Sequence, residues 1–145
     1  MKHQDKIYAV IDTNVIISSY LSKNGASNPA FVVNAIFEQK IIPLYNDEII
    51  NEYREVLQRS KFNFPKQIIN HFLTAILSLG IQVEGNQTHD EEFPDPKDVV
   101  FYEVKMAIED SYLVTGNIKH FPKIPLVVTP AQMVDILKEK GLIKK

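Results

Sequence analysis

The fold is decided by the stretch Ile7-Tyr8-Ala9-Val10-Ile11-Asp12-Thr13-Asn14-Val15-Ile16-Ile17-Ser18. The apolar run before Asp12 is too short to predict a helix, and its β-branched members suit a strand that is buried on both faces. A carboxylate at the end of such a strand costs free energy unless it has a partner or a function. Because ligands of open α/β sheets bind at the carboxyl ends of the strands, Asp12 is the first candidate functional residue.

Asp12 also has a structural interpretation. An Asp followed by Thr, Asn and a helical pattern is a common N-cap. A carboxylate has two oxygens, so a cap and a metal ligand are compatible roles for one side chain. Both interpretations remain open at this point.

The rest of the chain alternates between strand-like and helix-like patterns. Further strands are predicted at 41–45, 80–83, 112–115 and 126–129. Helices are predicted at 15–21, 30–39, about 47–59, 65–79, 95–108 and from 130 onward, with a polar loop over 84–95. Pro43 favours an edge strand or a strand start. This alternation predicts an α/β fold, a three-layer α/β/α sandwich with a mainly parallel central sheet.

Composition sets the broad class. The 145 residues suit one domain over 1–145, and the absence of cysteine excludes disulfides and zinc–thiolate sites. Neither a signal segment nor a run long enough to cross a membrane is found, which predicts a cytoplasmic protein without a membrane partner. The formal charge of −2 does not indicate a nucleic-acid binder, so a nuclease of this composition needs bound metal ions or a local basic patch.

Glu52 lies at the edge of a helical apolar arc. At about 100° per residue, Ile49, Tyr53 and Val56 share that arc, and Glu52 is the acid of this helix nearest to it. It is therefore the acid of this helix expected to point toward the end of the sheet. A boundary glutamate with a solvated carboxylate is the competing interpretation.

Two more acids flank Pro96, and local evidence explains both of them structurally. Asp95 is a natural N-cap, and Asp98 falls in the first helical turn, where a carboxylate is favoured by the helix dipole. Asn117 repeats the placement of Asp12, because it follows the strand at 112–115, although a turn residue after Gly116 explains it equally well. What favours a site is convergence, since Asp12, Glu52 and Asp98 all fall at a strand end or in an early helical turn.

With these motifs in view, the sequence resembles the PIN domain family, and within it the VapC-like toxin components of bacterial toxin–antitoxin pairs. The resemblance rests on four motifs in order, Val10-Ile11-Asp12-Thr13-Asn14-Val15, Glu48-Ile49-Ile50-Asn51-Glu52-Tyr53-Arg54-Glu55-Val56-Leu57, Asp95-Pro96-Lys97-Asp98-Val99-Val100-Phe101 and Tyr112-Leu113-Val114-Thr115-Gly116-Asn117. It implies a metal-dependent ribonuclease with Asp12, Glu52 and Asp98 as its acids. Many members carry Asp at the fourth position, which is Asn117 here.

Such a cluster suits Mg²⁺ or Mn²⁺, which bind oxygen ligands, polarise phosphoryl oxygens and activate water. Asp12 and Asp98 are expected as direct ligands, and Glu52 as a ligand through water or as the residue that orients the attacking water. Asn117 can offer an oxygen but no charge. Residues expected to support the ligands are Thr13, Asn14 and Thr115. For RNA contacts the candidates are Lys23, Arg54, Arg59 and Lys119, and His120 is a weaker candidate for a general acid.

Competing functions remain. A PIN-like domain without catalysis, serving as an RNA- or protein-binding module, is favoured by Asn117. A phosphatase that attacks with an Asp at this strand end needs a second acid two residues later, where this chain has Asn14. The resemblance further implies an RNA substrate, a protein antitoxin and a homodimer.

Overall fold

The computed structural model describes residues 6–87, 89 and 91–144. The strands are β1 (Ile7–Ile11), β2 (Ile41–Tyr45), β3 (Ile81–Gln82), β4 (Tyr112–Val114) and β5 (Val127–Val128). The α-helices are α1 (Thr13–Leu21), α2 (Asn28–Phe37), α3 (Asp47–Leu57), α4 (Lys66–Leu79), α5 (Val99–Ala107) and α6 (Pro130–Glu139), and two short 3₁₀ turns are η1 (Pro96–Asp98) and η2 (Ile118–His120).

The strands form one parallel sheet in the order β3-β2-β1-β4-β5. The chain leaves β1 toward β2 and β3, and then returns to β4 on the other side of β1. A reversal of this kind opens a crevice at the carboxyl ends of the two central strands. The topology therefore places the residues after β1 and β4 at the usual ligand site of such a sheet.

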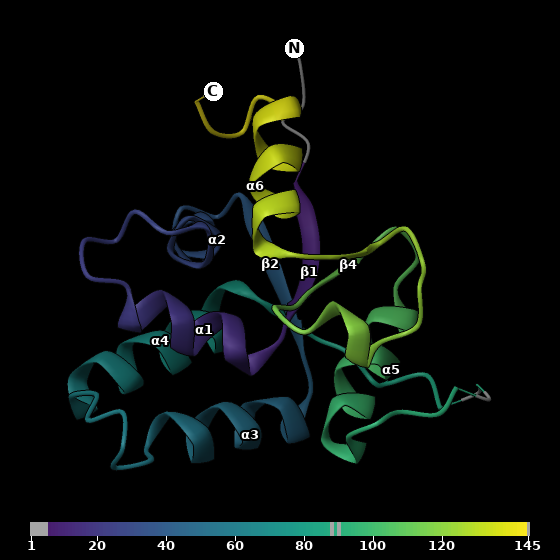
Figure 1. Ribbon diagram of the computed structural model, residues 1–145, viewed down its shortest axis with the longest axis horizontal. Coiled ribbons are helices and arrows are strands. Elements are labelled where there is room, and N and C mark those ends of the chain that lie inside the picture. Colours follow the sequence, from purple (N-terminus) through teal and green to yellow (C-terminus); the bar gives the residue numbers. More distant parts are fainter. Residues whose placement is uncertain (1–5, 88, 90, 145) are drawn as a thin grey trace.

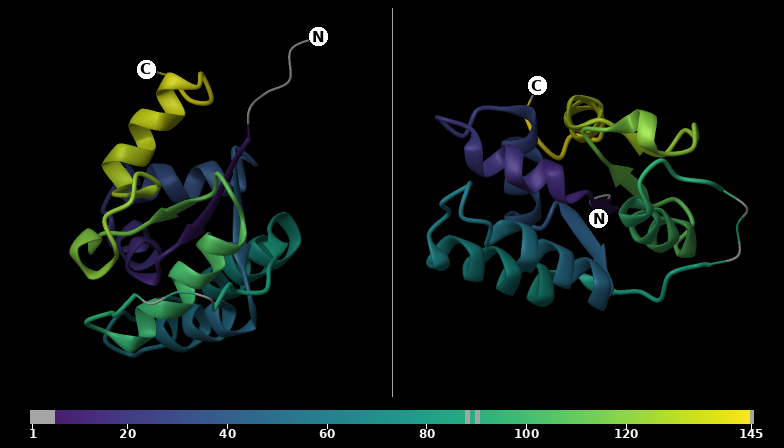
Figure 2. Two further views of the ribbon diagram at one scale, coloured as in Figure 1. Left: turned by 90° about the vertical axis from the view of Figure 1, so that its right-hand side faces the viewer. Right: turned by 60° about the horizontal axis from the view of Figure 1, so that its bottom comes forward.

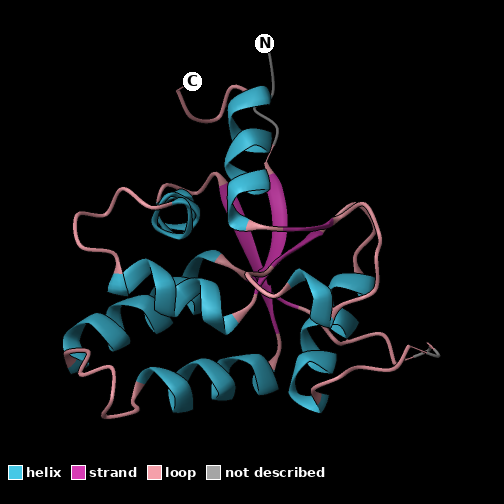
Figure 3. Ribbon diagram, in the orientation of Figure 1, coloured by secondary structure: helices cyan, strands magenta, loops and turns pink. Residues whose placement is uncertain are grey.

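Helices cover both sides of the sheet, which confirms the predicted three-layer architecture. Helices α1 to α4 lie on one side of β1 and β2, and α5 lies on the other (Figure 1). The magenta strands stand at the centre of the cyan helices in Figure 3, and α6 packs against α2. The described residues of the loop between β3 and η1 lie outside α5 (Figure 2).

The sequence predicted that β1 is buried on both faces, and this prediction was wrong for one residue. Tyr8 keeps 39% of its surface exposed, whereas Ala9 to Ile11 are fully buried. Tyr8 shares its face of the sheet with Leu44 and Ile81, according to the strand register. This is the side that carries α5, and α5 leaves an open hollow of about 830 Å³ at the amino ends of the strands.

Pro43 was expected at an edge or at a strand start, and this expectation was wrong. It is the third residue of β2, which lies between β1 and β3. Its carbonyl oxygen faces the β3 side, where a Cβ at Gly80 would come within 2.5 Å of it. Because β3 pairs only from Leu44 onward, the missing N–H of Pro43 faces a side without a ladder and removes no hydrogen bond.

Other boundaries follow the predictions closely. The predicted helix at 95–108 begins as the 3₁₀ turn η1 before α5. The loop at 84–95 is confirmed for the residues that are described, while Thr88 and Asp90 lie outside them. Within the described ranges, no helix is long and apolar enough to span a membrane.

Candidate active site

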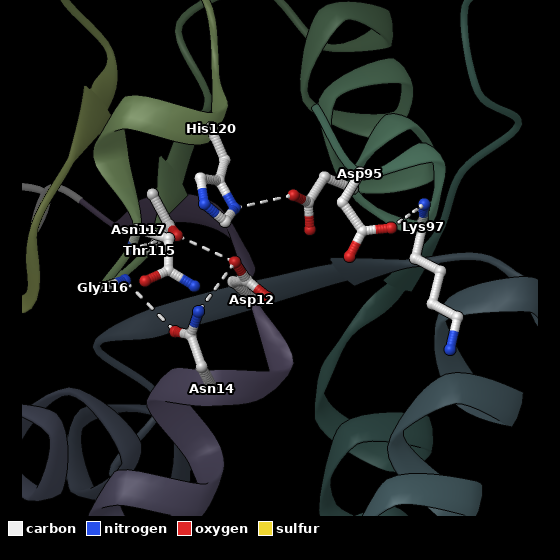
Figure 4. Close-up of polar contacts among 9 residues, drawn as sticks. Asp12, Asn14, Asp95, Lys97, Thr115, Gly116, Asn117 and His120 are labelled. Carbon is white, nitrogen blue, oxygen red and sulfur yellow. Dashed lines mark hydrogen bonds and ion pairs between the residues drawn. The ribbon is translucent and has the colours of Figure 1, made fainter. Parts of the chain in front are cut away.

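Asp12 lies directly after β1 and is only 5% exposed. Its backbone N–H donates a 2.9 Å hydrogen bond to the carbonyl of Val114, which continues the pairing of β1 with β4. Its Oδ2 accepts hydrogen bonds from Thr115 Oγ1 at 2.8 Å and from Asn14 Nδ2 at 3.2 Å (Figure 4). The carboxylate is therefore held in place by the end of β4 and by the first turn of α1.

Asp12 holds the N-cap position of α1, but its side chain makes no capping hydrogen bond. The cap interpretation is thus correct for position and wrong for the hydrogen bond. Its Oδ2 is instead bound by the side chains of Thr115 and Asn14, while the backbone N–H groups of Thr13 and Asn14 lie near enough to lower its pKa. A buried acid without its usual structural role is a candidate for a functional one.

Asn14 joins α1 to the end of β4. Its Nδ2 donates to Asp12, and its Oδ1 accepts a 3.1 Å hydrogen bond from the backbone N–H of Gly116. A side chain at Gly116 would crowd this contact, because a Cβ there would lie 3.3 Å from Asn14 Oδ1. Glycine therefore lets the two strand ends approach closely.

The acids converge on one small pocket of about 230 Å³ beside Asp12. We call it the acidic pocket. It is lined by Asp12, Thr13, Asn14, Ile17, Glu52, Val56, Arg59, Asp95, Lys97, Asp98 and Phe101. The larger hollow beside Tyr8 lies at the other end of the sheet, away from Asp12 and Glu52, so the chemistry points to the smaller pocket.

The structure gives Asp95 and Asp98 different roles, although the sequence explained both as structural. Asp95 Oδ1 accepts a 3.0 Å hydrogen bond from the N–H of Lys97 and so caps η1. Asp98 makes no capping bond, and its Oδ2 lies 3.2 Å from His120 Nδ1. Of the pair, Asp98 is the acid whose carboxylate is not used by its own backbone.

Burial and mutual repulsion raise the pKa values of the acids in the pocket. The pKa of Asp12 rises to about 6, mainly through burial and also through the charge of Asp98, while the hydrogen bond from Thr115 opposes the rise. Burial likewise raises the pKa of Asp98, and His120 opposes this. Burial also raises the pKa of Glu52, with a further contribution from Glu55 and opposition from Lys97 and Arg59.

Tyr53, on α3, holds the end of β1 in place through a hydrogen bond. Its hydroxyl donates a 2.5 Å hydrogen bond to the carbonyl of Ile11, the residue before Asp12. The ring is 1% exposed and contacts Phe72 and Phe101. Sequence reasoning placed Tyr53 in the core and missed the hydrogen bond, because nothing in a helical pattern indicates the partner of a buried hydroxyl.

The donor set fits a divalent metal ion. Asp12, Asp98 and Glu52 line one pocket, and a cation there would offset the burial and the charge of Asp98 that together raise the pKa of Asp12. Thr13 also lines it, and its buried Oγ1 has no hydrogen-bond partner in the described structure. No three acidic or histidine side chains among the described residues are already gathered tightly enough to hold an ion, so binding would draw them together.

Two basic residues border the acids. Arg59, a predicted RNA contact, lines the acidic pocket and also pairs with Glu55 at 3.1 Å. Lys97 lines it as well and was missed, although its place between Asp95 and Asp98 in the sequence could have indicated it. The other predicted contacts, Lys23, Arg54 and Lys119, are exposed and do not line the pocket.

Asn117 is exposed at the end of β4, and its backbone N–H donates to Thr115 Oγ1 at 3.0 Å. It is not among the residues that line the acidic pocket. The position that should repeat Asp12 therefore adds neither charge nor lining to the pocket in this structure.

Comparison with known proteins identifies the family. The family model described as PIN domain matches residues 8–119, which include every motif from Asp12 to Asn117. The search of curated proteins and the search of solved structures each found no match. Since the family match covers most of the chain and agrees with the parallel sheet and its acidic pocket, this chain belongs to the PIN domain family.

Proposed function

We propose that this protein is a metal-dependent ribonuclease that hydrolyses RNA phosphodiester bonds and acts as the toxin of a toxin–antitoxin pair. PIN domains are generally nucleases and typically use divalent metals. The observation that carries the proposal is Asp12, a 5% exposed acid whose pKa is raised to about 6 beside Asp98, in a pocket lined by further acids.

The residues divide the work as follows. Asp12 and Asp98 would hold Mg²⁺ or Mn²⁺, with Thr115 and Asn14 fixing the Asp12 carboxylate. Glu52 would hold the ion through water or orient the attacking water. When bound, the ion supplies Lewis-acid stabilisation of the charge that develops on the phosphoryl oxygens.

The basic side chains counter the acidity of the site toward RNA. Arg59 and Lys97 line the same pocket as the acids and lower the pKa of Glu52. They would hold the phosphates on either side of the bond that is cleaved. An overall charge of −2 makes such local contacts necessary, because the protein as a whole does not attract nucleic acid.

The activity is tested with purified protein, a mixed-sequence RNA and Mn²⁺, with and without a chelator. We expect cleavage that the chelator abolishes and that Asp12→Asn loses. Asp135→Asn is the matched control, because it makes the same change at an exposed position on α6. Cleavage by Asp12→Asn at the wild-type rate would reject the proposed site.

Asn117 favours a second candidate, a PIN domain that binds RNA or protein without cleaving. Under that hypothesis the RNA binds to the protein but remains intact with Mn²⁺.

The toxin assignment and the antitoxin partner have their own test. Expression should arrest bacterial growth, Asp12→Asn should relieve the arrest, and a DNA-binding protein encoded by an adjacent gene should restore growth. Sedimentation at several concentrations tests the proposed homodimer.

A further inference from the structure

The contact between His120 and Asp98 is not explained by either local backbone. Asp98 enters α5 and His120 ends η2, which lie 22 positions apart in the sequence. His120 Nδ1 lies 3.2 Å from Asp98 Oδ2, with 42% of the His120 side chain exposed (Figure 4, dashed line from His120). The pair is only partly buried and Asp98 is a candidate metal ligand, so we asked whether His120 serves the same site.

The turn η2 brings His120 back to the end of β4. The backbone N–H of His120 donates a 2.9 Å hydrogen bond to the carbonyl of Asn117, so the two residues are stacked by one turn of 3₁₀ helix. His120 therefore lies over the position where the fourth acid was expected. The turn η2 thus places the imidazole of His120 next to Asn117, whose side chain is an uncharged amide.

The spacing of the two side chains suits a shared ion. Mg²⁺ and ions of similar size hold ligands at about 2.1 Å in octahedral geometry, which separates neighbouring ligand atoms by about 3 Å. The distance between His120 Nδ1 and Asp98 Oδ2 is 3.2 Å. Both atoms can therefore reach one ion with little movement, although His120 itself does not line the acidic pocket and meets it through Asp98.

A second histidine provides a comparison within the chain. His89 Nε2 lies 3.1 Å from Glu103 Oε2, but that pair is mostly buried and packs against the rings of Phe93 and Tyr102. Its environment explains it as a packing contact. His120 is more exposed and contacts an acid of the pocket.

We propose that His120 is a nitrogen ligand of the metal site, and that it makes the site prefer Mn²⁺ and other first-row transition-metal ions to Mg²⁺. This inference rests on the proposed metal-dependent function. Mg²⁺ favours oxygen ligands and gives up its water reluctantly, whereas imidazole binds transition-metal ions well. Replacing a carboxylate with a neutral imidazole weakens the attraction for any cation and weakens it least for ions that accept nitrogen.

The test is pulsed electron paramagnetic resonance of the full-length protein loaded with Mn²⁺, in a buffer without imidazole or amines. We expect a ¹⁴N coupling to Mn²⁺ in the wild type and in His89→Ala, and none in His120→Ala. A Mn²⁺ titration with Mg²⁺ as competitor should give about tenfold weaker Mn²⁺ binding in His120→Ala, with a smaller loss for Mg²⁺.

His120→Asn separates a ligand from a residue that only orients Asp98, because the Asn amide can replace the N–H of Nδ1 in a hydrogen bond. An orienting role predicts that His120→Asn recovers the wild-type preference for Mn²⁺, and that result would overturn the proposal. Absence of ¹⁴N coupling in a wild type whose Mn²⁺ binding depends on Asp12 would overturn this proposal alone. Mn²⁺ binding that Asp12→Asn leaves unchanged would overturn the proposed function together with it.

Discussion

Thr115 Oγ1 donates a 2.8 Å hydrogen bond to Asp12 Oδ2 across 103 positions of the sequence. The same oxygen of Thr115 accepts from the backbone N–H of Asn117 at 3.0 Å. One fully buried hydroxyl therefore links the acid after β1 to the turn after β4.

Thr115→Val should raise the pKa of Asp12 above its value of about 6, because the lost hydrogen bond favours the charged carboxylate. Since metal binding requires that carboxylate to be deprotonated, the pH midpoint of Mn²⁺ binding should move upward. The free energy of unfolding at pH 7 should fall by about 1–3 kcal/mol. Calorimetry across pH measures the first effect and urea unfolding the second. Thr74→Val, at an exposed position on α4, should change neither.

Asp12→Asn should stabilise the metal-free protein as the pH rises. The folded pKa of Asp12 is about 6 against an ordinary value of 3.8, so between these values the folded state binds the additional proton. Stability attributable to Asp12 is therefore greatest below pH 3.8 and is lost as the pH rises through 6, by about 3 kcal/mol in total. The difference in unfolding free energy between Asp12→Asn and wild type should grow across this window. A difference in unfolding free energy that does not change with pH would show that the site does not destabilise the charged form of Asp12. In a separate measurement, Mn²⁺ should stabilise only the wild type.

Arg59→Ala should weaken RNA binding and reduce its dependence on salt. Each phosphate contact with single-stranded RNA contributes about −0.7 to the slope of log K against log salt. Fluorescence anisotropy with a labelled RNA and chelator, from about 50 to 200 mM salt, measures it. Arg54→Ala is the matched control, since Arg54 lies in the last turn of α3, five residues before Arg59, bonds to Asn51 and does not line the acidic pocket. Equal slopes for the two variants would exclude Arg59 as a specific phosphate contact.

Tyr53→Phe should lower the free energy of unfolding by about 1–3 kcal/mol, because the carbonyl of Ile11 loses a buried donor. Loss of this bond also frees the end of β1, so Mn²⁺ affinity should fall together with stability. Tyr8→Phe, at a 39% exposed position on β1, should leave the free energy of unfolding and the Mn²⁺ affinity unchanged. Urea unfolding with and without Mn²⁺ gives both quantities in one experiment.

Asn117→Asp should strengthen metal binding by adding a carboxylate at the end of β4. The added charge lies next to Thr115, which holds Asp12, so the pKa of Asp12 should also rise further in the metal-free protein. Calorimetric titration with Mn²⁺ measures affinity and the number of ions bound. Asn34→Asp, on the exposed side of α2, is the control that adds charge away from the site. Unchanged Mn²⁺ affinity in Asn117→Asp would place this residue outside the metal site.

Much of the architecture could be predicted because its signals are local. The apolar run Ile7–Ile11 and the periodic patterns of α3 and α4 depend on residues within a few positions, and the structure confirms the order of strands and helices. The prediction for β1 failed at Tyr8, because the burial of a strand face depends on how much of the sheet one helix, α5, can cover.

The sequence alone determined that Asp12 follows a buried strand and that Glu52 borders the apolar side of α3. Only the tertiary structure decided which oxygens are free. The Asp95 carboxylate accepts a hydrogen bond from the backbone of η1. The Asp98 carboxylate makes no capping bond and instead contacts His120, which belongs to another element. Asp12 makes no capping hydrogen bond in α1, and its Oδ2 is bound instead by Thr115, which is distant in the chain. Periodicity and capping patterns are short-range properties, but the partner of a buried oxygen depends on which element the fold brings beside it.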